Sequence, residues 1–305
     1  MVGGRRLVKR TESARRRARP GKSGRGRVTR QPPALPSGSI RHVQGAFYEP
    51  AGPDTYVATG ATAGPWSPDA QHGGPPSALA ALAIESHQPD ERQRLARVAI
   101  DILRPIPVGR ISTRTRMVRP GRRVALVETV LESDGQEVLH ARGWRIERPD
   151  REVPAVADGA AVPGPVPLVG DGMPPSIFDR EQHGYLASIE WRFMPQEFDG
   201  PARVRAAWTR PRIPLLAGEE MPPMARALLV ADSGSGVGAA LPSSAFIFIN
   251  VDLTVVIQRD PAGEWLLLES STTIGTDGTG LATTRLCDRL GGCGRGWQTL
   301  LVAPR

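Results

Sequence analysis

Asp252 is an acidic residue in an otherwise apolar stretch of the chain. Residues 246–256 are rich in Phe, Ile, Leu and Val, which predicts a buried strand with Asp252 in its middle. A carboxylate without hydrogen-bond partners is costly there, and partial burial raises a carboxyl pKa from about 3.9 toward that of a useful general base. Asp252 is therefore a candidate base for activating a water molecule. The alternative is a strand carboxylate satisfied by an Arg or a backbone amide, and Asp101, in a similar stretch, keeps that alternative open.

A second candidate group precedes a predicted helix over residues 75–87, which opens with two prolines and continues with Ala and Leu. The N-terminus of a helix presents unpaired N–H groups and a partial charge of about +0.5. The two prolines have no N–H to offer, so Gly73 and Gly74, with Ser77 as a further candidate, are the donors proposed for a substrate carbonyl or an oxyanion. His72 is a candidate helper, and its alternative role is that of a helix cap.

The same sequence elements occur twice in the chain, in the same order. The recurring landmarks are the Pro-Pro helix (75–82 and 222–229), an Asp in an apolar strand (Asp101 and Asp252) and a closing Arg-Gly-Trp (142–144 and 295–297). A helix rich in Ala and Leu on all sides should be buried, with a curved sheet around it. The repeat predicts an α+β double hotdog, in which two antiparallel sheets are each wrapped around a central helix.

The two copies differ in the residue that follows the shared Trp. The first copy has Arg145 at this position and the second has Gln298. A Gln amide can orient a water molecule while remaining neutral, so the second copy is the better candidate for hydrolytic chemistry.

Composition divides the chain into four predicted segments. Residues 1–40 carry twelve Lys or Arg and the single acid Glu12, which accounts for more than the whole net charge of +8 and predicts a disordered tail. A nucleic-acid partner is not expected, because the rest of the chain is slightly acidic. Residues 41–148 and 185–305 are the predicted hotdogs, and 149–184 is a linker rich in Pro and Gly.

Several classes of protein are disfavoured by the sequence. No uncharged apolar stretch approaches the roughly 20 residues that a membrane helix needs, and a cytoplasmic location is expected. The five His show no metal-ligand spacing, so neither a metal nor another cofactor is expected. Cys287 and Cys293 flank a predicted turn and are interpreted as free thiols.

Two short phrases that suggest other chemistry are given structural interpretations. His72-Gly73-Gly74 is similar to an esterase oxyanion phrase, but no Gly-x-Ser-x-Gly elbow accompanies it. The Gly- and Ser-rich stretch 232–236 is interpreted as the end of the second helix and the following loop.

Residues 44–305 resemble the thioesterase-like superfamily, in particular double-hotdog acyl-CoA thioesterases related to medium-chain acyl-CoA thioesterase II. The motifs that carry the resemblance are Gln-His-Gly-Gly-Pro-Pro (71–76), Asp-Ile-Leu-Arg-Pro (101–105), Arg-Pro-Gly-Arg-Arg (119–123), Glu-Trp-Leu-Leu (264–267), Asp-Gly-Thr-Gly (277–280) and Trp-Gln-Thr (297–299). The resemblance implies hydrolysis of acyl-CoA or a related acyl thioester by a water molecule that an Asp, a Thr and a Gln hold together. It assigns these roles to Asp252, Thr273 and Gln298, with Thr272 or Ser271 as alternatives to Thr273.

The resemblance also implies a homo-oligomer. The alternative function is that of a non-catalytic protein that binds an acyl group or acyl-CoA in the same groove.

Overall fold

The computed structural model describes residues 45–156, 163–178, 183–195 and 204–305, and residues His42–Arg305 form one compact unit. The predicted disordered tail lies outside the described residues, as do parts of the predicted linker. The predicted helix over 75–87 is confirmed as α1 (Gly74–Ser86), and the helix predicted from residue 222 onward is confirmed as α3 (Pro223–Ala231).

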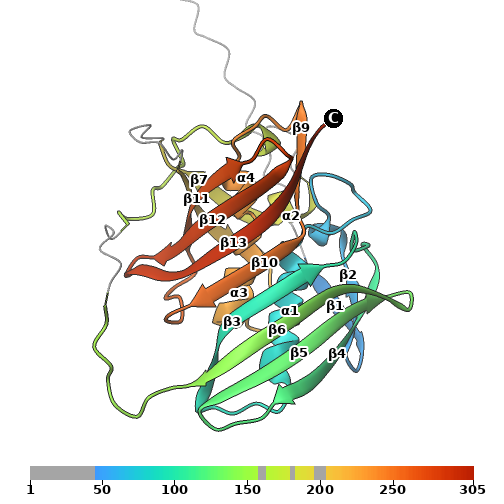
Figure 1. The fold of residues 1–305 in the computed structure, drawn as a ribbon, viewed down its shortest axis with the longest axis vertical. Helices are drawn as coiled ribbons and strands as arrows, with labels where there is room; N and C mark the ends of the chain where they lie inside the picture. Colours follow the sequence, from blue (N-terminus) through green and yellow to red (C-terminus); the bar gives the residue numbers. More distant parts are fainter. Residues whose placement is uncertain (1–44, 157–162, 179–182, 196–203) are drawn as a thin grey trace, which may run out of the picture. The chain divides into compact units, whose positions relative to one another are not determined.

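The other elements are mainly strands, most of which follow the central helix of their own half (Figure 1). The first half contains β1 (Tyr48–Gly52), β2 (Thr55–Ala58), the short 3₁₀ turn η1 (Gly60–Thr62), β3 (Gln93–Ile102), β4 (Arg110–Arg119), β5 (Val124–Ser133) and β6 (Gln136–Glu147). The second half contains η2 (Ser176–Phe178), α2 (Gly184–Ser188), β7 (Ile189–Phe193), β8 (Arg205–Pro211), α4 (Gly234–Val237), β9 (Phe246–Asn250), β10 (Asp252–Ile257), β11 (Leu266–Ile274), β12 (Thr279–Asp288) and β13 (Gly291–Pro304).

The strands of both halves form one sheet, where the repeat predicts two. The described residues give a 13-stranded sheet in the order β1-β2-β4-β5-β6-β3-β10-β13-β12-β11-β8-β7, with β9 paired to β13. Antiparallel pairing of β3 with β10 joins the halves. The physical reason is that a central helix covers a face of the strands and leaves their edges unpaired, so the edge of one half is satisfied by the edge of the other.

The register at this junction sets two like residues opposite each other. Asp252 pairs with Asp101, and the next pair along the strands is Leu253 with Ile100. Side chains of successive strand residues point to opposite faces. Leu253 and Ile100 are buried, so both Asp side chains belong to the other, outer face.

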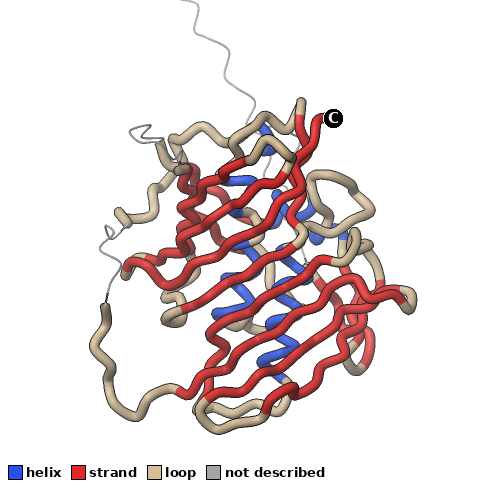
Figure 2. The backbone as a smooth tube through the Cα atoms, in the orientation of Figure 1, coloured by secondary structure: helices blue, strands red, loops and turns tan. Residues whose placement is uncertain are grey.

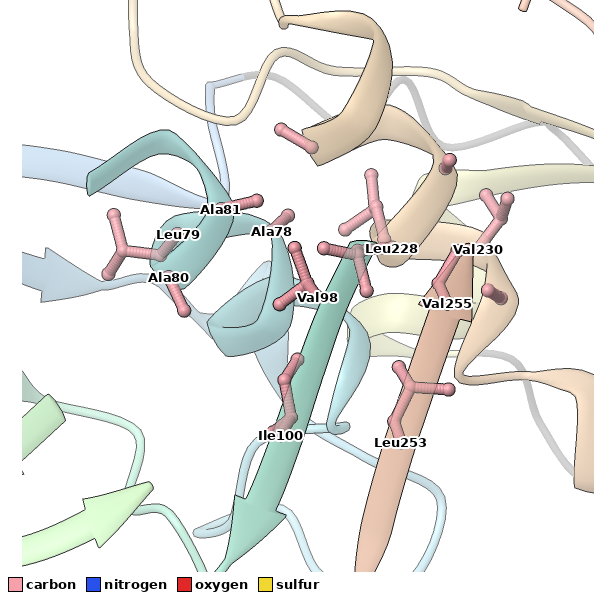
Figure 3. Packing of buried hydrophobic residues seen from close by; sticks show 14 of the residues in the cluster. Ala78, Leu79, Ala80, Ala81, Val98, Ile100, Leu228, Val230, Leu253 and Val255 are labelled. Carbon is pink, nitrogen blue, oxygen red and sulfur yellow. The ribbon is translucent and has the colours of Figure 1, made fainter. Parts of the chain in front are cut away.

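Helices α1 and α3 contact each other on the inner face of the sheet, where Figure 2 shows the helices together behind the strands. Leu79 and Leu228 are fully buried, and Figure 3 shows side chains of both helices packed over Val98 of β3 and Val255 of β10. The predicted burial of both Ala- and Leu-rich helices is confirmed. Their packing is close, because a Cβ on Gly74 would collide with the carbonyl oxygen of Leu229.

The predicted strand around Asp252 is divided in the structure. Strand β9 ends at Asn250 and β10 begins at Asp252, so the prediction that Asp252 lies in mid-strand is wrong. The amide of Val251 donates to the carbonyl of Thr299 at 3.0 Å, and its carbonyl accepts from the amide of Ile102 at 2.9 Å. The break occurs because the chain takes β3 as a second neighbour at this point, in addition to β13.

The two cysteines are free, as predicted, and both are buried. Cys287 pairs with Gly292 across the β12–β13 hairpin, so Cys293 does not lie directly opposite it. Burial raises the pKa of both thiols to about 12, which keeps them protonated and weakly reactive.

Candidate active site

A cavity of about 350 Å³ lies between elements of both halves. Its walls are mainly apolar, and the larger side chains that line it are Trp66, Ile102, Ile106, Ile177, Phe178, Leu186 and Phe248. The polar residues among its lining include His72, Asp232 and Asn250. A mostly apolar cavity with a few polar groups at one place is typical of a site for a small organic ligand.

Asp232 is the buried charge of this cavity. It is the residue that ends α3, and it is 4% exposed. Asn250 donates from Nδ2 to its Oδ1 at 2.8 Å, and Gln298 donates from Nε2 to the same oxygen at 3.3 Å. Nδ1 of His72 lies 3.0 Å from its Oδ2. Burial of this carboxyl group is tolerable because Asn250 and Gln298 donate hydrogen bonds to it.

Gln298 is 1% exposed on the inner face of β13 and joins Asp232 to the start of α4. Its Nε2 also donates to the backbone carbonyl of Asp232 at 2.9 Å, and its Oε1 accepts from the amide of Ser235 at 3.0 Å. Gln298 therefore closes the C-terminal end of the central helix of the second half. A capping role and a role in the site are compatible, because the same amide reaches Asp232.

Arg145 occupies the equivalent position in the first half and also closes its central helix. Its guanidinium donates to the carbonyl of Gln88 at 3.0 Å, to that of Glu85 at 3.1 Å, to that of His87 at 2.5 Å and to that of Ile84. Arg145 and Gln298 thus share one structural role, which is to cap the C-terminal end of the central helix of their half, although the two residues differ as predicted. What differs is that Gln298 also contacts a buried carboxylate.

His72 is held from two sides. Its ring stacks on Tyr185 with centroids 3.8 Å apart and planes 9° apart. Nδ1 accepts from the amide of Gly74 at 3.0 Å, and it also lies 3.0 Å from Asp232 Oδ2. One ring nitrogen cannot accept from Gly74 and donate to Asp232 at once, so in the neutral imidazole the proton is on Nε2.

Burial lowers the pKa of His72 below its ordinary value, and the negative charge of Asp232 opposes this only in part. The imidazole is therefore neutral at pH 7.

Gly73 and Gly74 are explained first by packing. A Cβ on Gly73 would overlap the carboxylate of Asp232, just as one on Gly74 would overlap the carbonyl of Leu229. The glycines let the N-terminus of α1 approach the C-terminus of α3. Gly73 also lines the cavity, so the prediction that its amide contacts a substrate stays a prediction.

Asp252 and Gln298 are not brought together. Asp252 accepts from the amide of Thr299 at 2.5 Å and from the hydroxyl of Thr299 at 3.3 Å. Thr299 follows Gln298 in β13, so the two side chains point to opposite faces of the sheet. Asp252 lies on the outer face with Thr299, and it is not among the residues that line the cavity.

Thr273 also lies on the outer face, where it is exposed in β11 and pairs with Leu281. Thr272, the alternative to it, pairs with Ala282, which in turn pairs with Gln298, so Thr272 shares the inner face with Gln298. Its hydroxyl is buried without a hydrogen-bond partner among the described residues. The predicted set of Asp252, Thr273 and Gln298 is therefore not assembled at one place in this structure.

Comparison with models of protein families decides the family. The model for the acyl-CoA thioesterase N-terminal domain matches residues 62–146, and that for the acyl-CoA thioesterase C-terminal domain matches residues 158–302. The chain belongs to the acyl-CoA thioesterase family. The resemblance stated from the sequence motifs is confirmed at this level. Among curated proteins no significant match was found.

Solved structures of thioesterases and hotdog proteins are similar to this acyl-CoA thioesterase family member in fold. A putative thioesterase II from Thermobifida fusca is 19% identical, with a TM-score of 0.64, over 84% of this chain and 95% of that chain. A hotdog-fold protein from Alicyclobacillus acidocaldarius is 16% identical, with a TM-score of 0.64, over 82% and 92%. An acyl-CoA thioesterase II from Mycobacterium marinum is 16% identical, with a TM-score of 0.61, over 85% and 96%. These identities establish similarity of fold.

Within the described residues, no helix is long and apolar enough to span a membrane.

Sequence reasoning missed Asp232 and Asn250. The stretch 232–236 was interpreted as a helix end, and Asp232 does end α3, but its side chain turns into the cavity. The available signal was an acid at the end of an apolar helix, followed by small residues that allow close approach. Asn250 gave a similar signal, because it is a neutral polar residue in the apolar stretch before Asp252.

Proposed function

We propose that this protein hydrolyses acyl thioesters, with acyl-CoA as the substrate, in the cavity beside Asp232. The observation that carries the proposal is a buried carboxylate with two side-chain donors, Asn250 and Gln298, and with His72 at 3.0 Å, at the wall of a mainly apolar cavity. Membership of the acyl-CoA thioesterase family supports it.

The proposed reaction needs a water molecule, a base for its proton and donors for the oxyanion that forms on the thioester carbonyl. The polar group around Asp232 supplies the negative charge and the hydrogen bonds that orient the water. The amide of Gly73 at the N-terminus of α1 is the proposed oxyanion donor, because the amide of Gly74 donates to Nδ1 of His72. Apolar side chains such as Phe178 and Phe248 provide the surface for the acyl group.

The size of the cavity bears on how the substrate binds. At about 350 Å³ it lies at the small end of the range for ligand pockets, about 300–1,000 Å³. We propose that it takes the acyl group and the thioester, and that the nucleotide of CoA stays outside. Arg104, at the cavity lining, is placed to contact the phosphates.

The fold enters this proposal as two fused hotdogs. Each central helix is wrapped by strands of its own half, and β3 and β10 fuse the two units edge to edge. Each half alone lacks part of the site, since His72 belongs to the first and Asp232 to the second.

The test is turnover of a panel of acyl-CoA esters of different chain length, followed with a thiol reporter. We expect Asp232→Asn to reduce kcat by about 10²–10⁴-fold, since the buried charge is lost while the shape is kept. The matched control is Asp252→Asn, which removes the outer-face carboxylate and is expected to keep wild-type kcat. Loss of turnover in Asp252→Asn with full turnover in Asp232→Asn would move the site to the residues that the sequence resemblance implies.

Absence of turnover by the wild-type protein with every ester, together with tight binding of an acyl-CoA, would favour the alternative, a non-catalytic acyl-CoA binding protein.

A further inference from the structure

We propose that the pantetheine arm of acyl-CoA binds along the free edge of β9, the edge away from β13, where its amide groups pair with the backbone of Phe248 and Asn250. The arm then adds to the sheet as a short extra strand. This inference rests on the proposed thioester hydrolysis and names the part of the chain that holds the substrate next to the thioester.

Strand β9 has a partner on one edge only. It pairs with β13, whereas β10, which follows it along the same side of β13, also pairs with β3. Strand β3 ends at Ile102, whose amide donates to the carbonyl of Val251 at the point where β9 ends and β10 begins. Among the described residues, therefore, no strand continues the sheet beside β9.

The backbone of β9 directs alternate residues to its two edges. The amide of Val251 donates to the carbonyl of Thr299, and the amide of Arg305 donates to the carbonyl of Ala245. Both bonds fit the register of β9 and β13. Since hydrogen-bonded and non-hydrogen-bonded pairs alternate along antiparallel strands, the odd-numbered residues of β9 are the ones that bond to β13.

The free edge of β9 therefore presents the N–H and C=O groups of Phe248 and Asn250. Within the described ranges, no backbone group forms a hydrogen bond with them. Residues 248–251 all line the cavity. Because successive side chains of a strand point to opposite faces, a cavity lined by four residues in a row lies along the edge of the strand. The unpaired backbone groups thus face the place where the substrate is proposed to bind.

Pantetheine has the chemistry that this edge requires. It is a flexible arm with two amide groups, each of which has one donor and one acceptor like a peptide unit, and it carries the thioester sulfur at one end. Peptides bind to free sheet edges through the same main-chain hydrogen bonds. Asn250 also donates from its side chain to Asp232, so an arm paired with the backbone of Asn250 ends beside the buried carboxyl group.

The side chains around the free edge suit the apolar parts of the arm. Ile249 and Val251 are 41% and 49% exposed, although both line the cavity. They offer apolar contact to the methylene and dimethyl groups of pantetheine. The ring of Phe248 packs edge-on against Trp66 with centroids 5.3 Å apart, which holds the strand against the segment that precedes α1.

The first test compares thioesters of one acyl group that carry different lengths of the arm. An S-ethyl thioester has no amide, an N-acetylcysteamine thioester has one and a pantetheine thioester has two. With the full-length protein we expect kcat/KM to rise about threefold to tenfold with each amide, since the net contribution of one hydrogen bond corresponds to a factor of this size.

The second test removes one N–H from the free edge. Phe248→Pro deletes this group without interrupting the pairing of β9 with β13, and Phe248→Ala is the matched control, because it also removes the ring but keeps the N–H. We expect the ratio of kcat/KM for the pantetheine thioester to that for the S-ethyl thioester to be about threefold to tenfold lower in Phe248→Pro than in Phe248→Ala.

Residue-resolved hydrogen exchange in the unaltered protein gives a third measurement. The probe is S-hexyl-CoA, a thioether that has the whole arm and cannot be hydrolysed. We expect it to slow exchange of the Phe248 and Asn250 amides at least fivefold. The internal control is the amide of Ile249, which faces β13 and should change less than twofold.

The outcomes separate this inference from the proposed function. Equal kcat/KM for all three thioesters would overturn the pairing of the arm with β9 and leave thioester hydrolysis standing. Equal ratios in Phe248→Pro and Phe248→Ala, or unchanged exchange at Phe248 and Asn250, would overturn it as well. If Phe248→Pro fails to fold, the exchange measurement decides the question. Absence of turnover with every thioester would overturn the proposed hydrolysis, and slowed exchange at the two amides would then still support the edge site.

Discussion

Asp232 and Asp252 have different surroundings, although each is an acid with hydrogen-bond donors close by. Asp252 is satisfied by the amide and hydroxyl of Thr299 on the outer face, whereas Asp232 has only side-chain donors and faces a cavity. A carboxylate with backbone partners is stable wherever the strand carries it. A buried carboxylate that is held by side chains requires several elements to meet at one place. Functional sites are commonly found where charged groups are held in such an environment.

Glu85, in the last turn of α1, is a buried acid whose ionisation should affect the stability of the protein. Burial raises its pKa to about 7 from an ordinary value of 4.5; Asp260 adds to this, and Arg145 and Arg148 oppose it. Since the pKa is raised on folding, its contribution to stability is complete below about pH 4.5 and is lost as the pH rises to 7.

We therefore expect the free energy of unfolding of the wild type to fall relative to that of Glu85→Gln as the pH rises. From pH 5 to pH 8 the difference between the two proteins should change by roughly 2–3 kcal/mol in favour of Glu85→Gln. Urea denaturation at the two pH values measures this, with the exposed Glu91→Gln as the control. An equal difference between Glu85→Gln and the wild type at both pH values would contradict it.

At the scale of the elements, the two central helices end in the same way. The residue after the Gly-Trp pair of the neighbouring strand reaches the last carbonyls of the helix, through Arg145 at α1 and Gln298 at α3. The final carbonyls of a buried helix have no intrahelical partner, and leaving them unpaired is costly. The repeat in the sequence thus includes this cap, although its chemistry differs between the halves.

Removal of the cap at α1 should destabilise the protein without touching the cavity. Arg145→Ala leaves the carbonyls of Ile84, Glu85, His87 and Gln88 without their side-chain donor, and we expect a loss of about 3 kcal/mol or more in the free energy of unfolding. Urea denaturation measures the loss. The control is an arginine of the outer face, because Arg142→Ala breaks only exposed pairing to Glu128 and should cost less than about 1 kcal/mol. Equal losses in the two variants would show that the contacts to α1 carry no special weight.

The helices and strands were largely predictable from the sequence, but the face of the sheet on which a given side chain lies was not. Pro-Pro pairs and Ala-Leu runs predict both central helices, because these signals are local. The face that Asp252 takes depends on the break at Val251, and that break depends on β3 becoming a neighbour of β10. A single-residue change of phase moves a side chain to the other side of a sheet, so sequence alone assigned Gln298 to the right element but grouped it with the wrong face.

On the scale of the whole molecule, the two halves form one compact unit. The sheet is continuous through β3 and β10, α1 packs on α3, and the cavity is lined by residues of both halves. Each half supplies part of the surface that covers the other's central helix, and each supplies part of the cavity lining. The repeat in the sequence therefore explains why the two halves contain the same elements, whereas the stability of the protein and the cavity depend on both halves together.

Separation of the halves tests this interdependence directly. Residues 42–148 and 149–305, produced alone, would each expose an unpaired edge strand, β3 or β10, and an apolar helix face, so we expect aggregation or loss of the native spectrum. We expect neither half alone to hydrolyse acyl-CoA above about 1% of the intact chain, since removing a positioned catalytic group typically costs 10²-fold or more. Production of both halves in one cell should restore measurable turnover, because the pairing of β3 with β10 and of α1 with α3 requires no covalent link. A second-half fragment that is folded and active by itself would contradict a site built across the junction, since His72 belongs to the first half.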